Sequence, residues 1–193
     1  MISKSLFVLA IKSCLAIWLC FQLISCMPVI KLVYGLHDPK YVSDADVIKY
    51  YNRIGLEGDI YRLKKYSEEN RKAYRYLGNK MPDVLLFNSN GQLVKFEIDC
   101  SSTLDSIVQL APHDIDKMST EINSLQDFVS ESYTIGNVVG EDLMHHQKPV
   151  YALKFAEFAG KLNKDFVPEL IERLKGRDDV EYVLLNMDYT IRE

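Results

Sequence analysis

The stretch that most constrains the fold of this chain runs from residue 81 to residue 96, MPDVLLFNSNGQLVKF. Its unbroken apolar run, residues 84–87, is typical of a central strand that is buried on both faces of a sheet. The pair Asn90-Gly91 favours a tight hairpin turn in which both central residues adopt positive φ. Residues 93–96 then form the returning strand. The stretch predicts a central β-hairpin, which defines a shape but indicates no reaction.

Strand and helix patterns alternate along the rest of the chain, whose 193 residues suit one domain of ordinary size. The expected strands are 29–34, 59–64, 84–87, 93–96, 150–155 and 180–186. The expected helices follow the capping residues Ser43, Ser67, Ser102 and Ser119 or begin at Asn163, and residues 133–148 are expected to be mainly loop. This order predicts an α/β fold with a mixed sheet, to which the last β-α-β unit adds parallel strands.

The N-terminal segment differs in composition from the rest of the chain. Residues 14–24, CLAIWLCFQLI, form an apolar segment of the length expected for a signal-peptide core. The segment ends in residues 23–26, LISC, which resemble the lipobox of bacterial lipoproteins. The resemblance implies cleavage after Ser25 and a diacylglyceryl thioether on Cys26. It would make residues 1–25 a signal peptide and would anchor residues 26–193, as a single domain, to a membrane of the bacterial envelope, facing the periplasm.

An uncleaved transmembrane anchor is the alternative, because residues 6–24 approach the length that spans a bilayer. Lys12, in the middle of that segment, argues against it, since a charge within the span is costly. Both interpretations tether the chain to a membrane. After cleavage Cys100 would be the one free thiol, so the mature chain would form no internal disulfide.

Charge and motifs exclude several classes of function. The formal net charge is −4 and the chain has no basic block, so we expect no nucleic-acid partner. Gly160-Lys161 lacks the upstream glycine and the following Ser or Thr of a phosphate-binding loop. No Gly-rich dinucleotide loop and no nucleophile elbow is present either. The sequence therefore predicts no bound cofactor.

Three parts of the sequence resemble the thioredoxin superfamily. They are residues 81–91, residues 148–160 and residues 183–188. The first resembles that family's cis-proline strand, turn and return strand, with Pro82 as the proline. The other two resemble the strands on either side of its active-site helix. In thioredoxins the active-site β-α-β unit precedes the cis-proline hairpin, whereas here it follows. The resemblance implies a three-layer α/β sandwich in a permuted or extended form.

This chain departs from the family at its defining motif. Thioredoxins carry two cysteines in C-x-x-C, of which the first attacks as a thiolate and the second resolves the mixed disulfide. The matching window, residues 159–162, is AGKL and contains no sulfur. The loop around His37 also lacks cysteine. We therefore expect a redox-inactive binding or scaffolding module with a protein partner in the envelope, and a ligand cleft near Pro82, His37, Ala159 and Gly160 is a further possibility.

Two other candidate sites are weaker. Cys100 is the alternative catalytic residue, as the lone thiol of an oxidoreductase or peroxidase. The acidic neighbours Asp99 and Asp105 would raise the pKa of that thiol, and cysteine is often a small buried residue, so a structural role is favoured. His145 and His146 suggest a metal, but adjacent side chains diverge and no zinc-ligand spacing is present. We predict a solvated loop there and no metal site.

Overall fold

The computed structural model describes residues 31–64, 83–95, 106, 108–135 and 147–190. Within them, one mixed sheet has the strand order β5-β4-β3-β7-β8-β2-β6, and β1 pairs with β9 separately. The strands are β1 (Tyr41–Val42), β2 (Ile60–Leu63), β3 (Asp83–Phe87), β4 (Gln92–Val94), β5 (Thr120–Ser124), β6 (Ser132–Ile135), β7 (Val150–Phe155), β8 (Glu181–Asn186) and β9 (Tyr189–Thr190). The helices are α3 (Asp44–Arg53), α6 (Pro112–Ile115), α7 (Leu125–Ser130), the 3₁₀ turn η2 (Glu157–Ala159) and α8 (Lys161–Leu174). The predicted α/β class with a mixed sheet is confirmed.

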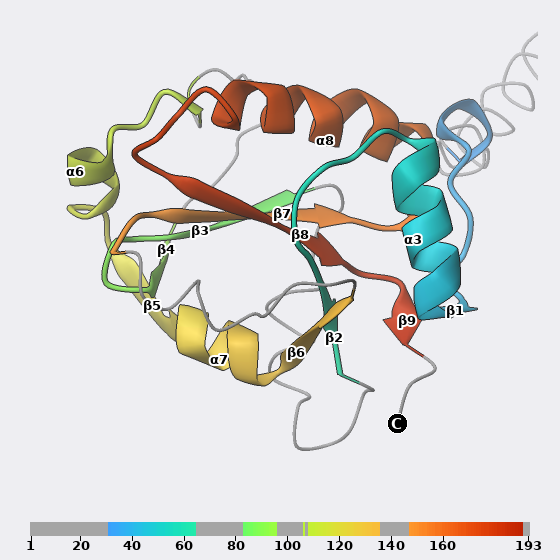
Figure 1. The fold of residues 1–193 in the computed structure, drawn as a ribbon, viewed down its shortest axis with the longest axis horizontal. Helices are drawn as coiled ribbons and strands as arrows, with labels where there is room; N and C mark the ends of the chain where they lie inside the picture. The colour runs from blue at the N-terminus through green and yellow to red at the C-terminus, as the bar shows by residue number, and fades with distance from the viewer. Residues whose placement is uncertain (1–30, 65–82, 96–105, 107, 136–146, 191–193) are drawn as a thin grey trace, which may run out of the picture.

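Helices lie on both sides of the sheet. Figure 1 shows α8 and α3 on one side and α7 on the other. The core is correspondingly divided, because successive side chains of a strand point to opposite faces. Leu86 and Leu184 belong to the cluster that includes residues of α3 and α8, whereas Phe87 and Leu185 belong to the cluster that includes residues of α7. The sheet is thus buried on both faces, as the apolar run of residues 84–87 predicts.

The central hairpin is present, but its turn differs from the expected one. β3 lies between β7 and β4 and pairs antiparallel with both. Gly91 has a φ of 73°, whereas Asn90 has no positive φ. The Gly91 amide donates to the Asn88 carbonyl at 2.8 Å, and the Asn88 amide donates to the Gln92 carbonyl at 3.0 Å. This is the three-residue loop that places one glycine in the left-handed region after a normal turn.

The predicted C-terminal β-α-β unit is confirmed. β7 and β8 are parallel, with Phe155 opposite Asn186 at their carboxyl ends. α8 connects them and buries Val167, Leu170, Ile171 and Leu174. β2 extends the parallel set on the other side of β8, with Arg62 opposite Asn186.

Three of the expected elements are wrong, wholly or in part, where the structure describes them. Residues 31–34 are helical rather than extended, and the Leu36 amide donates locally to the Lys31 carbonyl at 2.9 Å. The helix expected after Ser119 is wrong in its first half, where residues 120–124 form β5 because β4 offers them a pairing edge, and Ile122 is fully exposed. Its second half is confirmed, because residues 125–130 form α7. Within residues 133–148, which were expected to be mainly loop, residues 133–135 instead belong to β6, because they pair with β2; residues 136–146 lie outside the described residues. The helix expected after Ser67 lies outside the described residues, as do residues 103–105 and 107 of the one expected after Ser102; residues 106 and 108 are helical.

None of the helices in the described part of the chain is long and apolar enough to cross a membrane.

Candidate functional site

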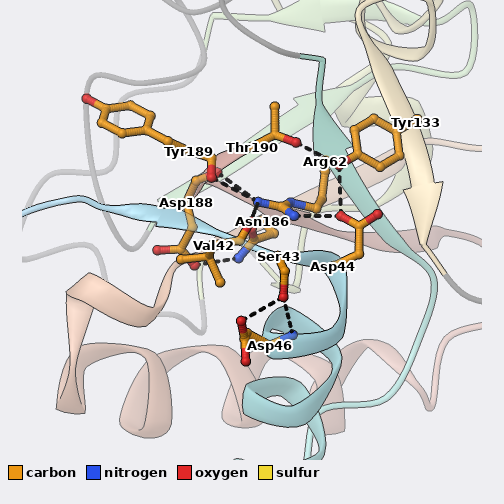
Figure 2. Close-up of polar contacts among 10 residues, drawn as sticks. All are labelled: Val42, Ser43, Asp44, Asp46, Arg62, Tyr133, Asn186, Asp188, Tyr189 and Thr190. Atoms are coloured by element: carbon orange, nitrogen blue, oxygen red, sulfur yellow. Dashed lines mark hydrogen bonds and ion pairs between the residues drawn. The ribbon is translucent and has the colours of Figure 1, made fainter. Parts of the chain in front are cut away.

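Polar side chains gather at one edge of the sheet, where the parallel strands β2, β7 and β8 have their carboxyl ends. Ligands of open α/β sheets commonly bind outside such an edge. Arg62, Asn186 and Asp188 are buried there, and Asp44 joins them from the start of α3. These four residues are called the edge cluster below, and Figure 2 shows them with their neighbours.

Arg62 is the centre of the edge cluster, and its side chain is only 1% exposed. Its Nη1 donates to Asp44 Oδ1 at 2.6 Å. Its Nη2 lies near three backbone carbonyls, those of Val42 at 3.1 Å, Tyr189 at 3.2 Å and Asp188 at 3.4 Å. A buried guanidinium needs such partners, because an unpaired charge is strongly penalised away from water. Arg62 therefore joins β1, β9 and the start of α3 to the main sheet.

Asp44 is held by a second donor. The Tyr133 hydroxyl donates to Asp44 Oδ1 at 2.8 Å and lies 2.9 Å from the Thr190 hydroxyl. Burial raises the pKa of Tyr133 above its ordinary value, although the hydrogen bond with Thr190 acts in the opposite direction. Tyr133 therefore stays neutral at physiological pH and serves as a donor to the carboxylate.

Asp188 is a buried carboxylate on the other side of the edge cluster. Its Oδ2 accepts hydrogen bonds from the Glu157 amide at 2.8 Å and from Asn186 Nδ2 at 2.9 Å. Burial raises the pKa of Asp188 because desolvation penalises the charged form more than these hydrogen bonds favour it. Asp188 Oδ1, Asn186 Oδ1 and Arg62 Nε have no hydrogen-bond partner among the described residues. The edge cluster therefore retains unused hydrogen-bonding capacity, which is common at functional sites.

A second buried cation lies at the same edge on the opposite face of the sheet. The side chain of Lys154 is 1% exposed, and its Nζ donates to Asp83 Oδ2 at 3.1 Å. The two residues are also opposite one another in the β3–β7 ladder. This pair lies on the α7 side of the sheet and includes Asp83, the first residue of β3.

The structure brings three of the predicted cleft residues together through their backbone. The His37 amide donates to the Phe158 carbonyl at 3.1 Å, next to Ala159 and Gly160. Gly160 has a φ of 56°, and a Cβ there would lie 2.3 Å from the Tyr34 carbonyl oxygen. Ala159 is buried, whereas His37 is exposed. Backbone from residues 34–37 therefore packs against the loop that was expected to line a cleft.

The remaining predicted site residues lie outside the described part of the chain. They are Pro82, Cys26, Cys100, His145 and His146. Among the residues that are described, no group of three His, Cys, Asp or Glu side chains is placed to hold a metal ion.

A pocket of about 280 Å³ opens beside the edge cluster. It is lined by residues 40–42, by the α3 side chains Asp46, Lys49, Tyr50 and Arg53, and by Glu157. Lys40 Nζ lies 3.1 Å from one carboxylate oxygen of Glu157, and Arg53 Nη2 lies 4.0 Å from the other. The Arg53 guanidinium also lies over the ring of Tyr50, 5.1 Å from its centre.

Arg62, Asn186 and Asp188 are not among the site residues predicted from the sequence. The available signals were an arginine within an apolar strand and the sequence Asn-Met-Asp at the end of another. Comparisons with protein-family models, curated proteins and solved structures find no match to this chain.

Proposed function

We propose that this protein is a lipid-anchored module of the bacterial envelope with a thioredoxin-like core, which binds or positions a partner without dithiol chemistry. The LISC sequence at residues 23–26 supports the lipid anchor. The arrangement of the sheet supports the core, because strands from the three parts that resemble thioredoxins are neighbours in it. β3 of the hairpin pairs antiparallel with β7 of the β-α-β unit, despite the reversed order in the chain.

The observation that carries the redox-inactive assignment is the structure of the loop between β7 and α8. In the proposed fold this loop would hold the C-x-x-C motif, and here it contains no sulfur. Backbone also covers this loop: the carbonyls of Tyr34 and Gly35 lie against Gly160, and the His37 amide donates to the Phe158 carbonyl. A mixed disulfide requires an accessible thiolate at this place. This loop supplies none, which supports a module that works without dithiol chemistry.

The redox part of the proposal is tested with the full-length chain purified in a neutral detergent. We expect that the chain does not accelerate the reduction of a protein disulfide by dithiothreitol. Alkylation of Cys100 across pH is measured in parallel, with denatured protein as the reference. Rapid labelling of the native chain well below the ordinary thiol pKa of about 8.5, together with peroxide consumption lost in Cys100→Ser, would replace the binding module with a single-cysteine enzyme.

The anchor is tested by expression in a bacterium fed with a traceable fatty acid. The full-length chain should incorporate the label, and its mature form should begin at Cys26. Cys26→Ser should abolish incorporation, whereas Cys20→Ser, a matched change within the segment that cleavage would remove, should not. Incorporation that persists in Cys26→Ser, or a mature chain that retains residues 1–25, would contradict the lipid anchor.

A further inference from the structure

The pocket beside α3 is positively charged, although the chain as a whole is acidic. Three cations line it, Lys40, Lys49 and Arg53, and the formal charge of the chain is −4. Two carboxylates also line it, but Asp46 is engaged at the start of α3, where it accepts from Ser43 Oγ at 2.6 Å. Among the described residues Lys49 forms no ion pair. The pocket formed by these residues and Glu157 is called the cation pocket.

Glu157 shows that the cation pocket accommodates an anion. Its carboxylate lies between Lys40, from the segment before β1, and Arg53, from the last turn of α3. Its backbone is fixed independently, because the Glu157 amide donates to Asp188 at 2.8 Å. The side chain can therefore rotate away without a backbone change, and two cations from different elements then face the vacated position. Stacking on the Tyr50 ring helps to keep Arg53 oriented.

We propose that the cation pocket binds a dianionic phosphate group, which displaces the carboxylate of Glu157. With Glu157 displaced, the three cations and Asp46 leave a formal charge of +2, which a dianion matches better than the single charge of Glu157 does. Arginine and lysine are also the side chains that phosphate groups recruit in proteins. The pocket lies at the carboxyl ends of the parallel strands, where α/β folds bind ligands. A volume of about 280 Å³ suits a phosphate monoester or one lipid headgroup and is too small for a polymer.

This inference does not depend on the lipid anchor. Because the cations are about half exposed or more, we expect weak binding that weakens further with salt. The probe is inorganic phosphate, added to the full-length chain in neutral detergent at low ionic strength and followed by phosphorus NMR. Dissociation constants on the order of 1 mM are expected for such an exposed site.

Four variants assign the binding to the cation pocket. Arg53→Gln and Lys49→Gln should each weaken binding by about three- to tenfold, because each removes one cation. Glu157→Gln should tighten binding by a similar factor, because it removes the competing charge; a role of Glu157 in structure alone would not produce this gain. Lys117→Gln, a change at an exposed lysine after α6, is the matched control and should leave the affinity unchanged.

A second arm identifies the source of the phosphate. Phosphatidic acid is added to the same micelles, and its headgroup signal is followed in the same variants. Binding of both probes, or of inorganic phosphate alone, with this pattern of variants supports a site for soluble phosphates. Binding of phosphatidic acid alone, with the same pattern, supports a lipid headgroup. If neither probe binds, or if the pocket variants behave like Lys117→Gln, the proposal is wrong.

Discussion

The two ends of the central sheet both bury polar side chains, but they satisfy them in different ways. At the hairpin end, Asn88 is only 2% exposed and bonds within its own turn. Its Oδ1 accepts from the Asn90 amide at 3.1 Å and from the Gln92 amide at 2.9 Å. At the carboxyl edge, Arg62 bonds to partners that lie 18 to 127 residues away.

The difference in range has a consequence for function. A bond between near neighbours in sequence stabilises a turn and can be completed locally, as around Asn88. The edge cluster instead forms hydrogen bonds that join β1, β2, β8, β9 and α3. It also contains atoms without a partner among the described residues, such as Asp188 Oδ1. Buried polar groups that are incompletely satisfied cost stability, so their retention points to a role beyond the fold. The candidate site at the carboxyl edge therefore contains buried polar atoms without a partner among the described residues, whereas both polar side-chain atoms of Asn88 are hydrogen-bonded.

The largest effect is expected for Arg62→Ala. The change removes the donor to Asp44 and to three backbone carbonyls, and it leaves the carbonyls of Val42 and Asp188 buried without this donor. The free energy of unfolding should therefore fall by about 3 kcal/mol. Urea denaturation of the full-length chain measures this loss. Arg173→Ala is the control, because Arg173 pairs with Glu169 four residues earlier on an exposed face of α8. That change should cost no more than about 0.5 kcal/mol. Equal losses in Arg62→Ala and Arg173→Ala would mean that Arg62 contributes no more than an exposed ion pair, and the contrast between the two ends of the sheet would be lost.

An intermediate effect is expected for Asn88→Ala at the hairpin end. The amides of Asn90 and Gln92 would lose their acceptor, and the free energy of unfolding should fall by about 2 kcal/mol. Asn88→Asp keeps an acceptor oxygen at the same place and should recover most of this loss. Because the bonds are local, the m-value should remain that of the wild type. If Asn88→Ala were more costly than Arg62→Ala, the local network would be the more important of the two.

A smaller and equal effect is expected at two helix caps, one at each end of the sheet. The Asp127 amide donates to Ser124 Oγ at the start of α7, and the Asp46 amide donates to Ser43 Oγ at the start of α3, both at 3.2 Å. Ser124→Ala and Ser43→Ala should each cost about 1 kcal/mol. Equal costs would show that the range of the bond, rather than its place in the molecule, determines the effect. A markedly larger loss for Ser43→Ala would instead mean that α3 is held by its cap more than by Arg62.

The elements that depend on signals close together in the sequence were predicted, and those that depend on distant partners were missed. The hairpin was predicted because its signals, the apolar run 84–87 and Asn90-Gly91, lie within a few residues of one another. The parallel unit was predicted from two apolar strands and the amphipathic helix between them. β5 and β6 were missed because pairing with β4 and with β2 overrode their local pattern. The positive φ predicted for Asn90 was wrong: the Asn90 amide donates to Asn88 Oδ1, and Gly91 alone in this turn has a positive φ.

The edge cluster was not predictable for the same physical reason. Arg62 lies in the sequence DIYRLK, where alternation suggests a residue that faces solvent. Only the packing of β1, β9 and α3 around it makes it buried. The cation pocket likewise combines Lys40, Arg53 and Glu157, and no local pattern connects the first two with a residue more than a hundred positions later.

The smallest effect is expected for Asp188→Asn, and its sign tests whether the edge cluster is electrostatically unbalanced. Burial raises the pKa of Asp188 above its ordinary value of 3.8. Below that value both the folded and the unfolded chain carry the proton, so burial of the charge costs nothing. As the pH rises, the unfolded chain ionises first, and stability falls until the raised pKa of the folded state is passed. Relative to the wild type, Asp188→Asn should therefore gain stability as the pH rises toward neutrality.

Asp179 provides a control of opposite sign for this measurement. Its hydrogen bonds from Arg177 lower its pKa. The stability it contributes is present above its ordinary value of 3.8 and is lost as the pH falls through the lowered one. Asp179→Asn should therefore lose stability, relative to the wild type, as the pH rises toward neutrality. Urea denaturation of both variants across this range measures the two trends. Parallel trends would mean that Asp188 is as well compensated as a surface ion pair, and the carboxyl edge would then no longer differ from the hairpin end.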